Sequence, residues 1–305
     1  MESPLVVGVD GSDPGLTALD WAVDEAVRQG RPLRIVYASL WERYEGAVPP
    51  WSTDRPWGQV LADTIVGQAA DRARRRAPGL PLTTRVAAED AAGALLQEGR
   101  QAWGVVVGAR GRTELGDLLL GSVGLVVAAR AWCPVVVVRG DRQALEARHG
   151  RILLGVGDQD VDAPSVAFAF REAAVRDAEL DAVRTWRRPL HDPLDHPLLR
   201  GEAGVYLAEE ASETLDKALA ARVREHPEVR VRRSSVEGAA HRVLTERSAA
   251  ADLLVLGARR RDGLVGLQLG RAAHRALHHA LCPVAVVPQP PLTTTTTAAV
   301  TEGDE

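Results

Sequence analysis

Four glycine and serine positions in the first half of the chain could bind a phosphate chain. They stand as Gly108-x2-Gly111-x9-Gly121-Ser122, directly after a run of three valines. Glycines that follow a strand let the backbone approach a ligand closely, because no Cβ is in the way. Consecutive N–H groups in such a turn form an anion-binding concavity. Ser122 is a favourable N-cap for the apolar helical pattern after it, and helix N-termini attract negative charge. The stretch 108–122 therefore predicts a phosphate site.

This spacing matches the nucleotide-binding signature of the universal stress protein family, in its ATP-binding branch. The resemblance covers nearly the whole chain, twice over. Two competing phosphate motifs are absent, since the sequence has no G-x-x-x-x-G-K-[ST] and no G-x-G-x-x-G after its first strand. The resemblance implies a cytoplasmic protein that binds ATP and acts as a stress-response sensor or regulator.

The same resemblance implies a place for each residue of the nucleotide site. Gly8 and Asp10 would lie near the adenosine part of the nucleotide, and Ala38 would border the base. Five consecutive residues would wrap the phosphates: Gly108, Ala109, Arg110, Gly111 and Arg112. Gly121, Ser122 and Val123 would hold the terminal phosphates at the start of a helix. Mg²⁺ is expected to accompany the phosphates, although no acidic pair dedicated to it is visible.

Apolar strands alternate with amphipathic helices through the first half. The periodicity predicts strands at 5–10, 33–38, 82–87, 104–108 and 135–138, and helices at 14–30, 58–76, 90–101 and 122–131. This alternation predicts a parallel sheet with helices on both faces. In such sheets ligands bind at the carboxyl ends of the strands, so Asp10 and Gly108 are expected to share one crevice.

After a polar linker at 139–150, the whole pattern restarts. Cys133-Pro134-Val135 recurs 149 positions later as Cys282-Pro283-Val284, and Trp21-Ala22-Val23-x-Glu25-Ala26 recurs 147 positions later as Phe168-Ala169-Phe170-x-Glu172-Ala173. We interpret this as a tandem duplication. It predicts two flavodoxin-like or Rossmann-like α/β domains at 1–140 and 150–289, each with five parallel strands in the order 3-2-1-4-5. The remaining segment, 290–305, is expected to be a disordered tail.

The motif is intact in the first half only. In the second half Gly157, Arg260 and Arg271 replace an acid, a glycine and a serine. An arginine in a left-handed turn would cost about 1–2 kcal/mol, and its side chain would intrude on the phosphates. We therefore predict that the first half binds ATP and that the second binds it weakly or not at all. The alternative is that Arg260 and Arg271 hold phosphate in a different geometry.

Other reactive residue types give no convincing second chemistry. Cys133 and Cys282 are expected to be buried thiols in a reducing cytoplasm. His274 and His278 share a helix face but lack the glutamate of an H-E-x-x-H zinc site. The His- and Asp-containing loop at 191–196 is interpreted as a solvated turn. No nucleophile or general base can be named, so the protein is at most a weak ATPase.

Composition limits the partners. The formal net charge is -4, which gives no general attraction to nucleic acid or to anionic membranes. No apolar stretch is long enough to span a bilayer. The leading hypothesis is an ATP-binding regulator with an unknown protein partner. The alternatives are a slow ATP hydrolase and a nucleotide-free interaction scaffold that uses the Trp-rich loop at 39–56.

The last strand of each half is apolar and is expected at a sheet edge. These strands lie at 135–138 and 284–287. Since bare hydrophobic edges invite pairing, the two are expected to join and make the chain an intramolecular pseudo-dimer.

Overall fold

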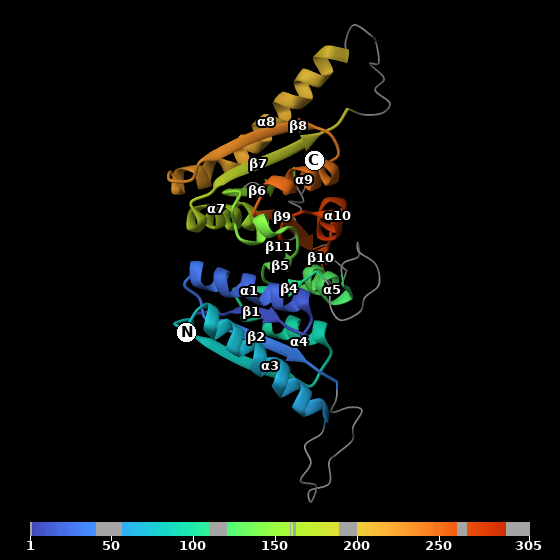
Figure 1. Ribbon diagram of the computed structural model, residues 1–305. Helices are drawn as coiled ribbons and strands as arrows, with labels where there is room; N and C mark the ends of the chain where they lie inside the picture. Colours follow the sequence, from blue (N-terminus) through green and yellow to red (C-terminus); the bar gives the residue numbers. More distant parts are fainter. Residues whose placement is uncertain are drawn as a thin grey trace, which may run out of the picture.

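The computed structural model describes residues 2–40, 57–109, 121–158, 160, 163–188, 200–260 and 267–290. Strands and helices alternate through both halves, which stack one above the other (Figure 1). The first-half strands are β1 (Leu5–Gly8), β2 (Leu33–Ala38), β3 (Leu82–Ala87), β4 (Gly104–Gly108) and β5 (Val135–Val138). Its helices are α1 (Asp13–Arg28), α3 (Trp57–Arg76), α4 (Ala91–Glu98) and α5 (Ser122–Arg130), and a short helix α6 (Arg142–Leu145) lies in the expected linker.

The second half repeats this order with one addition. Its strands are β6 (Arg151–Gly155), β7 (Glu179–Trp186), β8 (Val231–Glu237), β9 (Leu253–Arg260), β10 (Leu267–Gln268) and β11 (Val284–Gln289). Its helices are α7 (Pro164–Arg176), α8 (Arg200–Glu225), α9 (Ala240–Arg247) and α10 (Arg271–His279), with a 3-10 turn at Ser248–Ala250. The addition is β10, which pairs antiparallel with the end of β9.

All the strands of the described chain belong to one sheet, in the order β3-β2-β1-β4-β5-β11-β9-β6-β7-β8 with β10 beside β9. Each half therefore contributes five parallel strands in the order 3-2-1-4-5, counted within that half. The predicted α/β fold is confirmed. The sequence did not predict β10.

The two halves meet where β5 and β11 pair antiparallel, with Val136 opposite Ala285. We call this strand pair the seam. Because β4 runs parallel to β5 and β9 runs parallel to β11, the strands of the two halves point in opposite directions. The carboxyl ends of the first-half strands and those of the second-half strands consequently lie at opposite edges of the common sheet.

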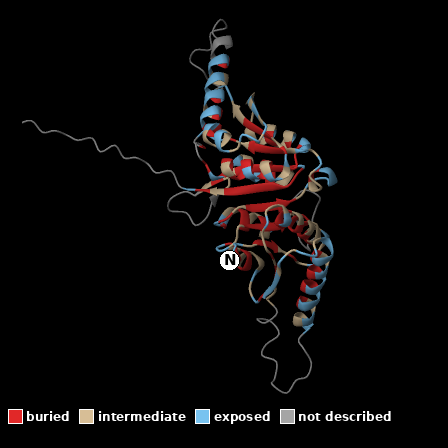
Figure 2. Cartoon of the chain, turned by 90° about the vertical axis from the view of Figure 1, so that its left-hand side faces the viewer, coloured by how far each residue is buried: buried red, intermediate tan, exposed pale blue. Residues whose placement is uncertain are grey.

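Buried side chains concentrate on the central strands and on the inward faces of the helices (Figure 2). One apolar cluster joins the sheet to α1, α3, α7 and α8, and a second joins the other face to α4, α5, α9 and α10. Cys133 and Cys282 are buried free thiols in the second cluster, as expected. Burial raises the pKa of Cys133 to about 11 and that of Cys282 further, so both remain neutral near pH 7.

Candidate functional site

A cavity of about 270 Å³ opens at the carboxyl ends of β1 and β4. Seven residues that the sequence analysis singled out line it: Gly8, Asp10, Ala38, Gly108, Gly121, Ser122 and Val123. Residues that were not singled out complete the described lining: Val9, Gly15, Val36, Ala91, Leu95, Val107 and Gly124. The topology thus brings together residues that lie more than a hundred positions apart in the sequence.

Asp10 is held at the mouth of this cavity by the start of α1. Its Oδ1 accepts hydrogen bonds from the backbone N–H of Ser12 at 3.0 Å and from the Ser12 hydroxyl at 2.6 Å. Ser12 in turn is the N-cap of α1, and its Oγ accepts from the Gly15 N–H at 3.2 Å. A Cβ on Gly15 would lie 2.6 Å from Asp10 Oδ1, so a larger residue there would displace the Asp10 carboxylate. The sequence indicates this N-cap through Ser12, because serine is a preferred N-cap residue.

The opposite wall is the amino end of α5. Gly121 is its N-cap, with φ -61° and ψ 147°, and no side chain caps the helix there. The prediction that Ser122 is the N-cap was wrong, since Ser122 is the first helical residue. In the described contacts no side chain accepts from the first N–H groups of α5, which makes these groups candidate donors to a ligand. The Gly121 N–H donates to the Ala109 carbonyl at 2.8 Å. This hydrogen bond holds the start of α5 next to the end of β4.

Several predicted residues cannot be placed in this geometry. Arg110, Gly111 and Arg112 lie outside the described residues, as do most of the Trp-rich loop, the loop at 191–196 and the tail after 290. Ala109 is described, but it does not line the cavity.

The equivalent place in the second half is a cavity of about 410 Å³ lined by Gly155, Gly257 and Gly270. Here an acid lies at Asp160, whose Oδ2 accepts from the Gly157 N–H at 2.6 Å. Asp160 also forms an ion pair with Arg259 at 2.8 Å. This second-half cavity therefore contains an internal anion and its counter-ion.

Gln289, at the end of β11, fills the space in front of Gly257. A Cβ built on Gly257 would lie 1.9 Å from Gln289 Nε2. This amide nitrogen donates to Ser165 Oγ at 2.8 Å, and Gln289 Oε1 accepts from Arg259 Nε at 3.0 Å. A network of three side chains thus occupies the carboxyl end of β9.

The expected strain at Arg260 is absent. Arg260 continues strand β9 and pairs with Leu267 of β10, so its backbone is extended and it does not adopt the left-handed turn of the motif. That expectation was wrong because Arg260 is the last residue of a paired strand. Arg271 is the first residue of α10, after the N-cap Gly270.

Comparison with known proteins agrees with this arrangement. The model of the universal stress protein family matches residues 1–139 and 149–288. The chain belongs to the universal stress protein family. A universal stress protein of Mycobacterium tuberculosis is 31% identical over 300 residues, which cover 93% of this chain and 97% of that protein. A relative from Mycolicibacterium smegmatis is 29% identical over 299 residues, with 94% and 97% coverage.

Among solved structures, the crystal structure of a universal stress protein from Archaeoglobus fulgidus superposes with a TM-score of 0.62. It is 15% identical in sequence and covers 93% of this chain and 98% of its own. At this identity the likeness concerns the fold. Within the described residues of this family member, no helix combines the length and apolar character that crossing a membrane requires.

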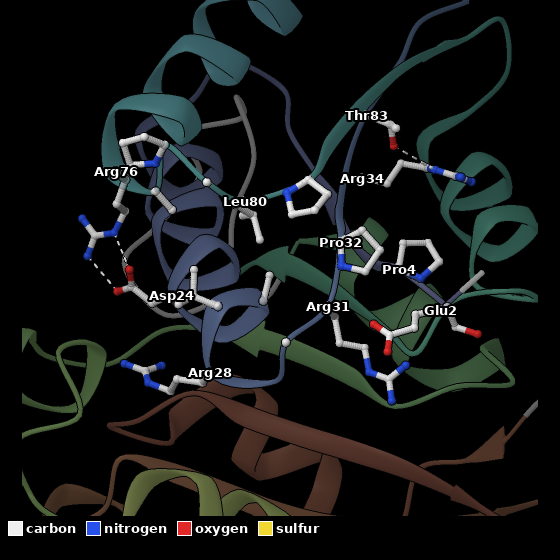
Figure 3. Close-up of a pocket in the computed structure, with 18 of the residues that line it drawn as sticks. Glu2, Pro4, Asp24, Arg28, Arg31, Pro32, Arg34, Arg76, Leu80 and Thr83 are labelled. Atoms are coloured by element: carbon white, nitrogen blue, oxygen red, sulfur yellow. Dashed lines mark hydrogen bonds and ion pairs between the residues drawn. The ribbon is translucent and has the colours of Figure 1, made fainter.

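A larger cavity lies at the amino ends of the first-half strands, at the opposite edge of the sheet from the motif. It measures about 1270 Å³, and its lining includes prolines that precede β1, β2 and β3 and arginines of α1, β2 and α3 (Figure 3). Arg76 pairs there with Asp24, and Arg34 with Glu98. Arg31 lies 5.9 Å over the ring of Trp103. None of the motif residues contributes to this cavity.

The histidines of α10 form no ligand set. The rings of His274 and His278 lie 4.7 Å apart, and burial, followed by the charge of His274, lowers the pKa of His278. No group of three or more His, Cys, Asp or Glu residues that could hold a metal occurs in the described part of the chain.

Proposed function

We propose that this universal stress protein binds one ATP in its first half and acts in the cytoplasm as a nucleotide-dependent regulator. The observation that carries the proposal is the cavity at the carboxyl ends of β1 and β4. Seven residues that the resemblance assigned to the nucleotide site line it together. A ligand site requires these residues to line one cavity. A turn that only connects a strand to a helix does not require it.

The chemistry of the lining suits the three parts of a nucleotide. Val36, Ala38 and Leu95 offer an apolar wall for a base. Asp10 offers a carboxylate to ribose hydroxyl groups. The uncapped amino end of α5 offers N–H donors to phosphate oxygens, as helix N-termini do in other phosphate sites.

Mg²⁺ fits this proposal as a companion of the phosphates. The described lining gives the ion one carboxylate, Asp10, and one oxygen of that carboxylate already accepts from Ser12. Mg²⁺ commonly takes most of its ligands from phosphate oxygens and water, so the phosphates would supply most of its coordination.

We infer that the second half does not hold ATP in the same way. Asp160 places a negative charge beside the end of β6, and Gln289 covers Gly257, against which phosphates would lie. A phosphate chain would have to displace the Asp160–Arg259 ion pair.

The test measures nucleotide in the native protein. We expect the denatured, purified protein to release about half a mole of ATP or more per chain on ion-exchange chromatography, and a titration of stripped protein to saturate at one ATP. Two equivalent sites would contradict the asymmetry. No release and no binding would favour the scaffold hypothesis, and phosphate production above the background of a Gly108 variant would favour the hydrolase.

We also propose that the seam makes the chain an intramolecular pseudo-dimer. The β5–β11 register supports this, because Val136 and Ala285 occupy equivalent positions in the two repeats. Val136 is 3% exposed, so Val136→Asp would bury a charge, and we expect faster proteolysis in the linker at 139–150. Unchanged proteolysis and melting would contradict a structural role for the seam.

A further inference from the structure

Two glutamates from different halves meet in the interior beside the seam. Glu25 lies on α1 and Glu172 on α7, and their side chains are each 1% exposed. Arg176, on the last turn of α7, is 4% exposed and forms ion pairs with both carboxylates. Gln29 donates from Nε2 to Glu25 at 2.8 Å and to Glu172 at 2.9 Å. We call these four side chains the seam cluster.

The seam cluster is built from equivalent positions of the two repeats. Glu172 follows Glu25 by 147 positions, and Arg176 follows Gln29 by the same number. The glutamates match, whereas the residue four positions later is neutral in the first half and cationic in the second. Two copies of the first half would therefore place two carboxylates together with no arginine. Two copies of the second half would place two carboxylates together with two arginines. The tandem chain gives two carboxylates and one guanidinium.

Outside the seam cluster, the second negative charge has one weaker counter-ion, Arg28, which forms a longer ion pair with Glu25. Arg28 approaches Glu25 only to 3.5 Å, and its side chain is 25% exposed. The strands of the seam present Val136, Val138, Ala285 and Val287 to the cluster that contains α1 and α7.

Several charged groups on and beside the neighbouring helices pair with groups outside the cluster. On α3, Arg72 pairs with Asp20 and Arg76 with Asp24. After α8, His226 lies against the ring of Phe170 and pairs with Glu228. None of these groups is part of the seam cluster.

We propose that Glu25 and Glu172 form a proton-binding site between the two halves, which holds one proton in the neutral pH range. A proton shared by the two carboxyl groups leaves one net negative charge, which Arg176 balances. Gln29 then donates to the remaining carboxyl oxygens. Without the proton, the second buried carboxylate is balanced only by the longer and partly exposed ion pair between Glu25 and Arg28.

The electrostatics agree with this arrangement. Burial, followed by the charge of Glu25, raises the pKa of Glu172 to about 8, although Arg176 opposes the shift. The proton belongs to the pair, since two interacting carboxyl groups titrate jointly. Because the folded protein holds the proton above the usual pKa of a glutamate, this contribution to stability is complete at low pH. It is lost as pH rises from about 4.5 towards 8.

The experiment is carbon NMR of the full chain with labelled glutamate side-chain carboxyls, between pH 5 and 9.5. We expect one glutamate pair to titrate with a midpoint near 8, while the exposed glutamates titrate in the usual acidic range. In Glu172→Gln this late titration should disappear. In Gln29→Arg, which copies the second repeat, a second guanidinium balances both carboxylates, so the titration should shift into the acidic range.

Asp71→Asn provides the matched control, because Asp71 is 64% exposed and its pair with Arg74 lies on the surface. This variant should keep the late titration of the wild type. A wild-type spectrum in which every glutamate titrates below pH 6 would overturn the proposal, whatever the variants do. Persistence of the late titration in both Glu25→Gln and Glu172→Gln would overturn it as well.

Discussion

The two halves have equivalent cavities at the carboxyl ends of their strands, but the polar side chains in the two cavities have different partners. In the first half the acid, Asp10, bonds only to the start of its own helix in the described contacts. In the second half the acid, Asp160, bonds to Arg259 and to the backbone of Gly157. The first cavity thus keeps its donors available to a ligand, and the second pairs its polar groups with one another.

Under the proposed asymmetry, this difference explains how the second half keeps its fold without a nucleotide. The Asp160–Arg259–Gln289 network satisfies buried polar groups that a ligand would otherwise satisfy. Buried polar groups without partners are costly, so a site that no longer binds its ligand is stabilised by internal partners. The extension of β9 into a hairpin with β10 also replaces a turn by paired strands.

The largest expected effect comes from the two N-cap glycines. Gly121 and Gly270 have similar extended backbones, with φ of -61° and -60°, so valine is sterically allowed at both. A valine at Gly121 adds a side chain to the cavity lining. We expect Gly121→Val to weaken ATP binding about 100-fold, or about 2.8 kcal/mol, and Gly270→Val to leave it within about twofold. Isothermal titration calorimetry measures the ATP affinity of both variants. Equal losses of affinity would contradict the proposed difference between the two cavities.

Substitution of the two acids should affect stability and ATP binding differently. Asp160→Ala leaves Arg259 without its carboxylate and the Gly157 N–H without its acceptor, so we expect a loss of about 2 kcal/mol in the free energy of unfolding. Asp10→Ala removes two local bonds near the surface and should cost about 1 kcal/mol or less, but it should weaken ATP binding. Urea unfolding and titration of the same samples test this. A larger loss of stability from Asp10→Ala would contradict it.

The smallest effect is expected from a single repair of the second cavity. Arg271→Ser restores the residue of the motif, but Gln289 still covers Gly257 and β9 still continues through Arg260. We therefore expect the stoichiometry to remain one ATP per chain and any change in affinity to stay within about twofold. A second ATP bound by this variant would show that one residue closes the site.

Much of the fold could be predicted from the sequence because the patterns that specify strands and helices are local. The bounds of β2, β3, β4 and β5 agree with the expected ranges. The meeting of Asp10 and Gly108 in one cavity was also predictable, since parallel strands bring their carboxyl ends to one edge.

The rest depends on contacts between distant segments. The path of Arg260 is set by β10, which begins seven residues later, and a motif comparison cannot show that pairing. The repeat of Glu25 as Glu172 was visible in the sequence. Their meeting depends on which strands form the seam and on how α1 and α7 lie over it.

The seam has a final consequence for how the protein behaves at high concentration. The largely apolar last strands of the two halves, β5 and β11, pair with each other inside the sheet, which leaves β3 and β8 as the outermost strands of the described sheet. These read LTTRVA and VRRSSVE, and most of their side chains are exposed. Arginine and other polar side chains on an outer strand discourage further strands from adding to it. Fusing the two halves thus protects the chain from self-association into fibres, because the strands most prone to recruit another copy are already covered by each other.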